Sequence, residues 1–227
     1  MTNTPDAAMT MIVATVDWWA AATRAAVVAG SLVIWFLTQK WIAAGAVPGA
    51  GIVDRVHLAT ARWHAWFAAS PRAANVALTT SSLCIDVIGL ALIGVSIFGA
   101  SFAPFLAVLL VFVARQISQT LCGLPSPPGM IWRDPGMPTL LVTYKVSNDF
   151  FFSGHTALAV LGATEAVRLG PAWLAAIAII MACAEAVIVL ILRAHWTLDV
   201  ITGAIAALLA SDIAHRLAPA IDGWLTH

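Results

Sequence analysis

The segment PAWLAAIAIIMACAEAVIVLIL, Pro171 to Leu192, is a continuous apolar run that contains one charged residue, Glu185. About 20 apolar residues are enough to cross the hydrocarbon core of a bilayer as an α-helix. Similar runs lie directly before and after it, at 150–168 and 196–217. Only the tight turn RLGPAW, 168–173, joins the run at 150–168 to the run at 171–192. We therefore expect three successive membrane crossings, the middle one at 171–192.

Three further apolar runs, at 25–43, 74–98 and 100–122, bring the expected transmembrane helices to six. The composition agrees, because 61% of the residues are hydrophobic, 10% are charged and the mean hydropathy is +0.93, values far from those of soluble domains. We predict an all-α, polytopic integral membrane protein that forms a single domain over residues 1–227. No basic segment or cleavage site marks the first apolar run, so we expect no removable signal peptide.

Two long connections, 44–73 and 123–149, follow odd-numbered predicted helices and should lie on one side of the membrane. The pattern of the first is compatible with an amphipathic helix in the interface plane, and the alternative reading is an ordinary amphipathic connector. Its apolar face would carry Val53, Val56, Trp63 and Phe67, and its polar face Arg55, His57, Arg62 and His64. The second has five prolines and three glycines, which predicts an ordered, irregular loop that serves as a lid or rim.

Most of the ten tryptophans lie near predicted helix ends, where membrane proteins place aromatic belts. We assign to such belts Trp18, Trp19, Trp41, Trp132, Trp173, Trp196 and Trp224. By this reading they mark membrane depth and take no part in chemistry.

His155 and His195 are 40 residues apart, which is two crossings, so both should return to the same membrane side. His195 and Asp199 share a helix face because they are four residues apart. The carboxylate can accept the proton of one imidazole nitrogen while the other nitrogen points outward. This is how a histidine nucleophile or base is oriented.

Ser153 and Gly154 precede a predicted helix, where free backbone N–H groups and the positive end of the helix dipole favour an anion. Arg115, Lys145 and Arg193 lie near the same membrane face and could neutralise that anion. Each feature alone has an ordinary explanation, such as an interfacial histidine, a helix start or a snorkelling arginine. Their convergence in a chain with few polar residues predicts a functional site.

The motifs SGHT, 153–156, and RAHWTLD, 193–199, resemble the second and third signatures of the type 2 phosphatidic acid phosphatase superfamily, six-helix membrane enzymes that act on lipid phosphates. The match is closer in one branch. NDFFFSGHT, 148–156, and RAHWTLDV, 193–200, are similar to the third and fourth motifs of sphingomyelin synthases, and RQISQTLCGLP, 115–125, to their second. The plant phosphatidylcholine:diacylglycerol cholinephosphotransferases share these features.

This resemblance covers residues 110–212 and implies that His155, His195 and Asp199 form a catalytic triad. The Lys-x6-Arg-Pro first motif of the phosphomonoesterases is absent, and Arg115 stands in its place, which argues against a plain phosphatase. Ser147-Asn148-Asp149 replaces the Cys-Gly-Asp of the sphingomyelin synthases and keeps the acid. By the same resemblance, Asp149 in the third motif and Thr120 in the second are expected to support the site.

The favoured hypothesis is a head-group phosphotransferase that works through a phosphohistidine on His195, with Asp199 fixing its tautomer and His155 as acid and base. The donor would be a membrane phospholipid with a phosphocholine- or phosphoethanolamine-type group. The acceptor would be a lipid alcohol of the diacylglycerol or ceramide type. Expected to hold the phosphoryl oxygens are Arg115, Arg193, Lys145 and the amides of Ser153 and Gly154.

No cofactor and no metal are expected, because a helix N-terminus and arginines suit an anion better than a zinc ion. A formal net charge of zero without a basic cluster argues against a nucleic-acid partner. The sequence leaves a homo-oligomer open.

Two alternatives use the same residues differently. A lipid phosphate phosphatase would share the triad and use water as acceptor. A transporter would instead line a path with Asp86, Glu165, Glu185 and Asp212, although Glu165 and Arg168 read more simply as a local pair.

The side of the membrane on which the site lies stays undetermined. Eight basic residues fall on the site's side, namely Lys40, Arg55, Arg62, Arg72, Arg115, Arg133, Lys145 and Arg193, against Arg24, Arg168 and Arg216 on the other. The positive-inside rule would make that side cytoplasmic. The family resemblance implies an exoplasmic site.

Overall fold

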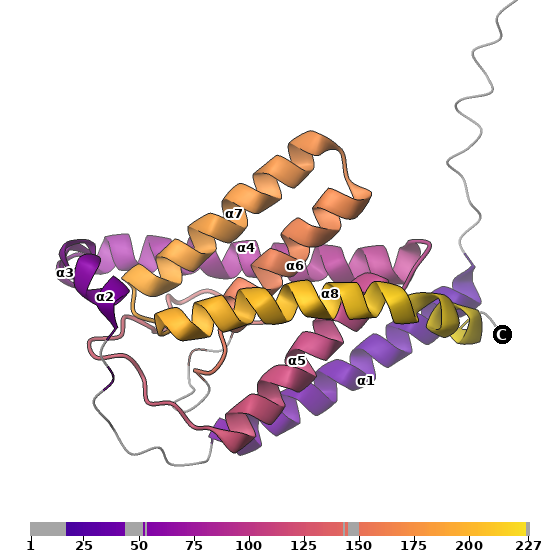
Figure 1. Ribbon diagram of the computed structural model, residues 1–227, viewed down its shortest axis with the longest axis horizontal. Helices are drawn as coiled ribbons and strands as arrows, with labels where there is room; N and C mark the ends of the chain where they lie inside the picture. The colour runs from indigo at the N-terminus through magenta and orange to yellow at the C-terminus, as the bar shows by residue number, and fades with distance from the viewer. Residues whose placement is uncertain (1–16, 44–51, 53, 143, 145–149, 226–227) are drawn as a thin grey trace, which may run out of the picture.

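The computed structural model describes residues 17–43, 52, 54–142, 144 and 150–225. Within them the chain forms eight helices and no strand (Figure 1). The helices are α1 Trp18–Ala43, α2 Arg55–Ala59, α3 Ala61–Ala69, α4 Pro71–Phe98, α5 Ala103–Leu121, α6 Gly154–Leu169, α7 Ala172–Ile191 and α8 Thr197–Leu225. The all-α prediction is confirmed for these residues, whereas Lys145 and Asp149 lie outside them.

Among the described helices, α1, α4, α5, α7 and α8 are the five that are long and apolar enough to cross a membrane. The sixth expected crossing, at 150–168, is wrong in its start and length. The helix there, α6, begins only at Gly154 and has 16 residues. Its length of about 24 Å is less than the roughly 30 Å of a bilayer core.

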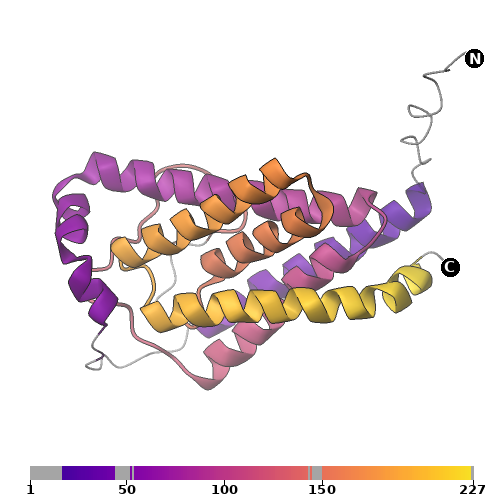
Figure 2. The same ribbon diagram turned by 45° about the horizontal axis from the view of Figure 1, so that its top comes forward.

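Helix α6 lies inside the bundle, packed against α4, α5, α7 and α8 (Figures 1 and 2). The packing against α4 is close, since a Cβ atom added at Gly162 would lie 2.6 Å from Ile88 Cγ2. Because protein rather than lipid surrounds much of α6, this helix does not need the length of a lipid-facing span.

The start of α6 touches the first turns of α8 through the main chain. The Ser153 N–H donates to the Asp199 carbonyl oxygen at 3.0 Å. One turn further along α8, a Cβ atom on Gly203 would lie 2.6 Å from the Ser153 carbonyl oxygen. Real Cβ atoms do not approach a carbonyl so closely, so glycine at 203 is what allows the two helices to meet.

The two short helices α2 and α3 pack against the end of α7 at one end of the bundle, on the left of Figure 1. The predicted division of their faces is reproduced only in part. Arg55 and Arg62 are exposed and Phe67 packs against the core, whereas Val53 lies outside the described residues. The buried residues are His57 and His64, whereas Trp63 and Trp66 are both 58% exposed. In a membrane interface the outer side suits tryptophan, while the inner side meets main-chain carbonyls that need N–H donors.

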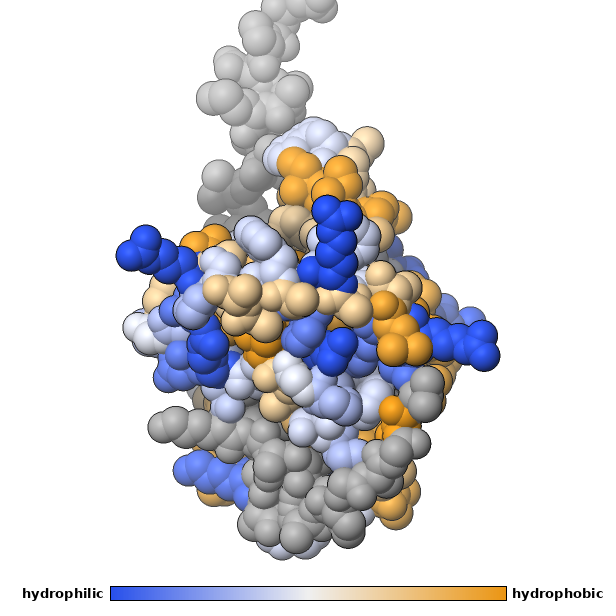
Figure 3. Space-filling view, turned by 90° about the vertical axis from the view of Figure 1, so that its left-hand side faces the viewer, coloured by the Kyte–Doolittle hydropathy of each residue, from blue (hydrophilic) through white to orange (hydrophobic). Residues whose placement is uncertain are grey.

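Figure 3 looks at this end of the molecule and shows strongly hydrophilic side chains projecting around a surface of mixed hydropathy. The exposed arginines of α2, α3, the start of α4 and the connection after α5 are Arg55, Arg62, Arg72 and Arg133. Their exposure agrees with a polar membrane boundary at this end and does not decide between the two sides of the membrane.

The tryptophans divide into two groups. Exposed at helix ends are Trp18, Trp19, Trp41, Trp173 and Trp224. Trp196 and Trp132 depart from the belt assignment, because Trp196 is only 4% exposed and Trp132 is partly buried in the protein core. Trp196 directly follows His195 in the chain, and the Trp132 ring contacts the His155 ring.

We predict that Gly203→Ala destabilises the protein by about 1–3 kcal/mol, because the added methyl group overpacks the contact with Ser153. The matched control is Gly94→Ala in α4, where a Cβ atom would meet nothing within 4 Å. That control should be neutral or stabilising, since alanine favours a helix over glycine. Thermal unfolding in detergent measures both variants. Equal stability of the two would contradict the close contact.

Candidate active site

His155 and His195 line one cavity of about 50 Å³. Arg115 and Gly154 line it as well, so four of the residues predicted for the site come together. The remaining wall is apolar and largely aromatic, and consists of Trp35, Ile85, Phe112, Trp132, Leu141, Phe150, Leu158 and Ala194. A cavity lined by both polar residues and aromatic rings suits a ligand with one charged end.

His195 follows α7 and lies just before α8, and it is 6% exposed. Its Nδ1 atom is 2.9 Å from the Phe150 carbonyl oxygen, which can only accept, so Nδ1 carries the proton. A neutral imidazole with a proton on Nδ1 has its lone pair on Nε2. The expected hydrogen bond from this ring to Asp199 is therefore replaced by one to the Phe150 main chain.

Asp199 is fully buried and has a double role. Its Oδ2 atom accepts from the Trp196 N–H at 2.9 Å, which satisfies a free amide at the start of α8. The same oxygen is 3.7 Å from His195 Nδ1, close enough to stabilise a positive charge on the ring. Its other oxygen, Oδ1, has no hydrogen-bond partner among the described residues.

His155 is the second residue of α6, whereas a helix that began at the predicted residue 150 would place it more than one turn inside. Its Nε2 atom is buried and has no hydrogen-bond partner within the described parts of the chain. The ring meets Trp132 edge to face, with centroids 4.9 Å apart and an interplanar angle of 89°. A buried, unpartnered nitrogen in a cavity wall is suited to a proton transfer with a bound ligand.

Arg115 projects from α5 onto the first turn of α6. Its Nε atom donates to the Phe152 carbonyl oxygen at 2.8 Å, and Nη1 lies 3.5 Å from Gln39 Oε1 of α1. A Cβ atom on Gly154 would be 3.4 Å from Arg115 Nε, so the guanidinium lies directly against this glycine. A buried cation beside a helix N-terminus makes a strong site for an anion.

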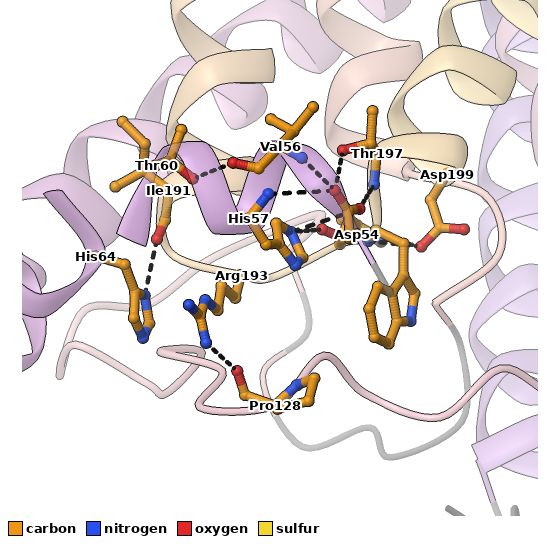
Figure 4. A network of polar contacts seen from close by, with 12 residues as sticks. Asp54, Val56, His57, Thr60, His64, Pro128, Ile191, Arg193, Thr197 and Asp199 are labelled. Atoms are coloured by element: carbon orange, nitrogen blue, oxygen red, sulfur yellow. Dashed lines mark hydrogen bonds and ion pairs between the residues drawn. The ribbon is translucent and has the colours of Figure 1, made fainter. Parts of the chain in front are cut away.

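Other predicted anion ligands have different contacts. The Ser153 hydroxyl caps α6 by accepting from the Thr156 N–H at 3.3 Å. The Ser153 N–H donates to the main-chain carbonyl oxygen of Asp199. Arg193 donates to the Pro128 carbonyl oxygen at 2.8 Å and points away from Asp199 (Figure 4). Thr120 is exposed and donates to the Gln116 carbonyl oxygen. These residues therefore shape the surroundings of the cavity and do not line it.

The sequence reasoning missed the aromatic wall. Trp35 lies within the apolar run at 25–43 and was not singled out, yet it is 7% exposed, and its Nε1 atom has no partner among the described residues. It stacks on Phe112 of α5 with centroids 4.7 Å apart and an interplanar angle of 6°. Hydropathy alone cannot separate an aromatic ring that faces lipid from one that faces a cavity.

The proline-rich connection after α5 is irregular, as predicted, and it supplies Trp132 and Leu141 to the cavity wall. It is bonded to the turn that carries His195. The Ile131 N–H donates to the Leu192 carbonyl oxygen, and Trp196 Nε1 donates to the Pro125 carbonyl oxygen, both at 2.8 Å. Its service as a lid stays a prediction.

The carboxylates of the transporter hypothesis have separate partners. Glu165 bonds His215 at 3.0 Å and Ser211 at 2.9 Å, which corrects the expected pairing with Arg168. Asp86 accepts from the Leu140 and Leu141 amides, Glu185 from Ser81, and Asp212 pairs with Arg216. Each of these four carboxylates therefore has a hydrogen-bond or ion-pair partner within the protein.

Comparison with known proteins gives one match. The model of the AtPDCT1/2 family, phosphatidylcholine:diacylglycerol cholinephosphotransferase, matches residues 53–216. No curated protein and no solved structure matches significantly. The matched range spans well over half of the 227 residues and includes both histidines, Asp199 and Arg115. With five helices fit to span a bilayer, the chain is an integral, multi-pass membrane protein that belongs to the AtPDCT1/2 family of enzymes.

Proposed function

We propose that this protein transfers a phosphocholine group from a phosphatidylcholine to a diacylglycerol-type lipid alcohol, through a phosphohistidine on His195. The observation that carries the proposal is the meeting of His155, His195 and Arg115 in one buried cavity at the start of α6. Membership of the cholinephosphotransferase family supports the substrate class.

In the first half of the reaction, His195 Nε2 attacks phosphorus and the bond from phosphorus to the glycerol oxygen breaks. Burial lowers the pKa of His155 to about 3 in the empty site, so the ring must first take up a proton together with the anionic phosphodiester. His155 then gives that proton to the glycerol oxygen, so diacylglycerol leaves as a neutral alcohol. The Phe150 carbonyl holds His195 Nδ1, and the Asp199 carboxylate at 3.7 Å offsets the positive charge on the ring.

In the second half, the incoming alcohol loses its proton to His155 and attacks phosphorus, and the bond from phosphorus to His195 breaks. Both histidines return to their initial states. Negative charge on the phosphoryl oxygens would meet the Arg115 guanidinium and the free amides at the start of α6, beginning with Gly154.

The aromatic wall supports choline over ethanolamine as the head group. A quaternary ammonium has no N–H group to donate and is bound best by the faces of aromatic rings. Trp35, Phe112, Trp132 and Phe150 line the cavity, whereas no carboxylate lines it among the described residues. A primary ammonium would leave N–H donors without acceptors in such a wall.

A second candidate, hydrolysis of a lipid phosphate, is favoured by one observation. A cavity of about 50 Å³ has room for water next to the histidines, and water could take the place of the alcohol. The product separates the two candidates, because a transferase makes a new phospholipid while a hydrolase releases a water-soluble phosphate compound.

We expect the purified protein to convert labelled diacylglycerol and phosphatidylcholine in bilayers into labelled phosphatidylcholine. His195→Ala and His155→Ala should abolish this product, since one removes the nucleophile and the other the acid. His215→Gln is the matched control, because it changes a histidine that bonds Glu165 away from the cavity and keeps an N–H donor. Soluble phosphocholine release in place of new lipid would establish hydrolysis, and turnover by His195→Ala would refute the nucleophile.

Asp199→Asn should retain the fold, because the amide oxygen can still accept from the Trp196 N–H. It should lower turnover by about 10² to 10⁴, as for the aspartate of a serine-protease triad. Asp212→Asn, which alters an exposed pair with Arg216, should leave turnover unchanged. Initial rates with equal amounts of folded protein make the comparison, and a fall of less than threefold for Asp199→Asn would limit this residue to capping α8.

Trp35→Leu and Trp132→Leu should lower the preference for phosphatidylcholine over phosphatidylethanolamine as donor. A cation–π contact contributes about 1–2 kcal/mol when it is desolvated, so the ratio of kcat/KM values should fall roughly 5- to 30-fold. Trp→Phe at the same positions should retain most of the preference, and Trp224→Leu, at an exposed position, should retain all of it. An unchanged ratio in both leucine variants would exclude the aromatic wall from head-group selection.

A further inference from the structure

The carboxylate of Asp54 binds the N-terminal ends of two helices at once (Figure 4). Within its own segment it caps α2, accepting from the Val56 and His57 amides at 2.9 and 3.2 Å. From α8 it accepts the Thr197 amide at 2.6 Å and the Thr197 hydroxyl at 2.8 Å. Both helix dipoles present their positive ends to this one carboxylate.

These bonds keep Asp54 charged. Burial by itself raises the pKa of the Asp54 carboxyl, but the hydrogen bonds from Thr197 and His57 outweigh it, and the pKa lies below its ordinary value. A charged, fully engaged carboxylate is a firm link between α2 and the first residue of α8.

His57 holds the main chain of His195 itself. Its Nε2 atom is 3.0 Å from the His195 carbonyl oxygen, which can only accept, so Nε2 is the donor. Burial lowers the pKa of His57 more than the nearby Asp54 raises it, so the ring is neutral with its proton on Nε2. The ring also stacks on Trp196, with centroids 5.6 Å apart and an interplanar angle of 25°.

The turn that carries His195 needs such external contacts. Arg193 adopts a positive φ of 54°, which is uncommon for a residue with a side chain and is kept only where surrounding contacts fix the backbone. The His195 ring is held from one side by Phe150, and its main chain from the other side by His57. His57 does not line the cavity, so it contacts the backbone and not the space for the lipid phosphate.

We propose that Asp54 and His57 are positioning residues for His195: from α2 they fix residues 195–197 so that the His195 ring stays aligned for attack on phosphorus. This inference rests on the proposed function, in which His195 is the nucleophile. Neither residue touches the substrate, and each acts through the main chain of the turn.

The expected effect is a loss of turnover without a loss of substrate binding. A displacement of a reacting group by about 1 Å costs on the order of 100-fold in rate. Without the His57 N–H the turn keeps its other contacts, so kcat should fall about 10- to 100-fold while KM changes less than about twofold. A purely structural role would lower the folded fraction and leave kcat per folded molecule unchanged.

His57→Leu and His57→Gln form the main test. Leucine removes the donor, whereas the glutamine amide places an N–H group near the position of Nε2, so glutamine should restore kcat to within about threefold of the unaltered enzyme. His64→Leu is the matched control, because His64 Nδ1 makes the same kind of bond, at 2.9 Å, to the Ile191 carbonyl oxygen of α7. This control should lower thermal stability and keep kcat.

A milder pair of variants serves if His57→Leu fails to fold. Thr197→Val removes only the hydroxyl that donates to Asp54, and we expect a fall in kcat of about threefold to tenfold. Thr60→Val removes a hydroxyl that donates to the Val56 carbonyl oxygen in α2, and its kcat should be unchanged.

The assay uses the full chain in phosphatidylcholine bilayers with labelled diacylglycerol, and kcat is divided by the folded fraction. Equal effects on kcat in His57→Leu and His64→Leu, or no rescue by His57→Gln, would overturn the positioning role. Head-group transfer that disappears in His195→Ala but persists undiminished in His57→Leu would refute this inference alone. Absence of transfer by the unaltered protein would instead refute the proposed function.

Discussion

The main-chain contact between Ser153 and Asp199 governs the site, because it joins the starts of α6 and α8. His155 stands just after one helix start and His195 just before the other, so this junction brings both rings to one cavity. It also brings the positive end of α8 next to that of α6, and the α6 end lies beside the buried guanidinium of Arg115. Such an arrangement is unfavourable without negative charge nearby. Asp199 and Asp54 supply part of that charge, and a bound phosphodiester would supply the rest.

Two of the three phenylalanines before α6, Phe150 and Phe152, serve the site through their carbonyl groups. In a helix that began at Phe150, these carbonyls would bond amides of the next turn. In the irregular segment the Phe150 and Phe152 oxygens instead accept from His195 Nδ1 and Arg115 Nε. The expected start of this helix was wrong for this reason. Counting residues needed to cross a bilayer assumes lipid on all sides, whereas α6 packs against four other helices.

Apolar run length and local motifs are the parts of the structure that could be predicted. Hydropathy predicted six spans, and five of them correspond to helices long and apolar enough to cross a bilayer, because lipid-facing helices must be apolar along their whole length. The His-x3-Asp spacing predicted that His195 and Asp199 lie close together, and they do, at 3.7 Å, although His195 precedes α8 and does not share a helix turn with Asp199. Contacts between distant segments could not be predicted in this way. Asp54 before an amphipathic segment signals a helix cap, but nothing in the sequence indicates that it also binds Thr197.

The sequence also could not predict which face of α2 and α3 packs against the rest of the protein. Amphipathic periodicity divides α2 and α3 into two faces without telling which one the protein covers. In water the apolar face would pack inward. At a membrane boundary the tryptophans can remain outside, and His57 and His64 turn inward to bond the carbonyls of His195 and Ile191.

The small volume of the cavity suggests how such an enzyme would favour transfer over hydrolysis. Exchange of a phosphocholine group between two diacylglycerols converts like into like and has almost no driving force, whereas hydrolysis of a phosphohistidine is downhill. A transferase must therefore restrict water by kinetics, and a cavity of about 50 Å³ walled by aromatic rings leaves little space for water once a head group enters. In such an enzyme the departing and the arriving alcohol would share the entrance to the cavity, so a phosphohistidine on His195 would meet a new acceptor only when a lipid occupies that entrance.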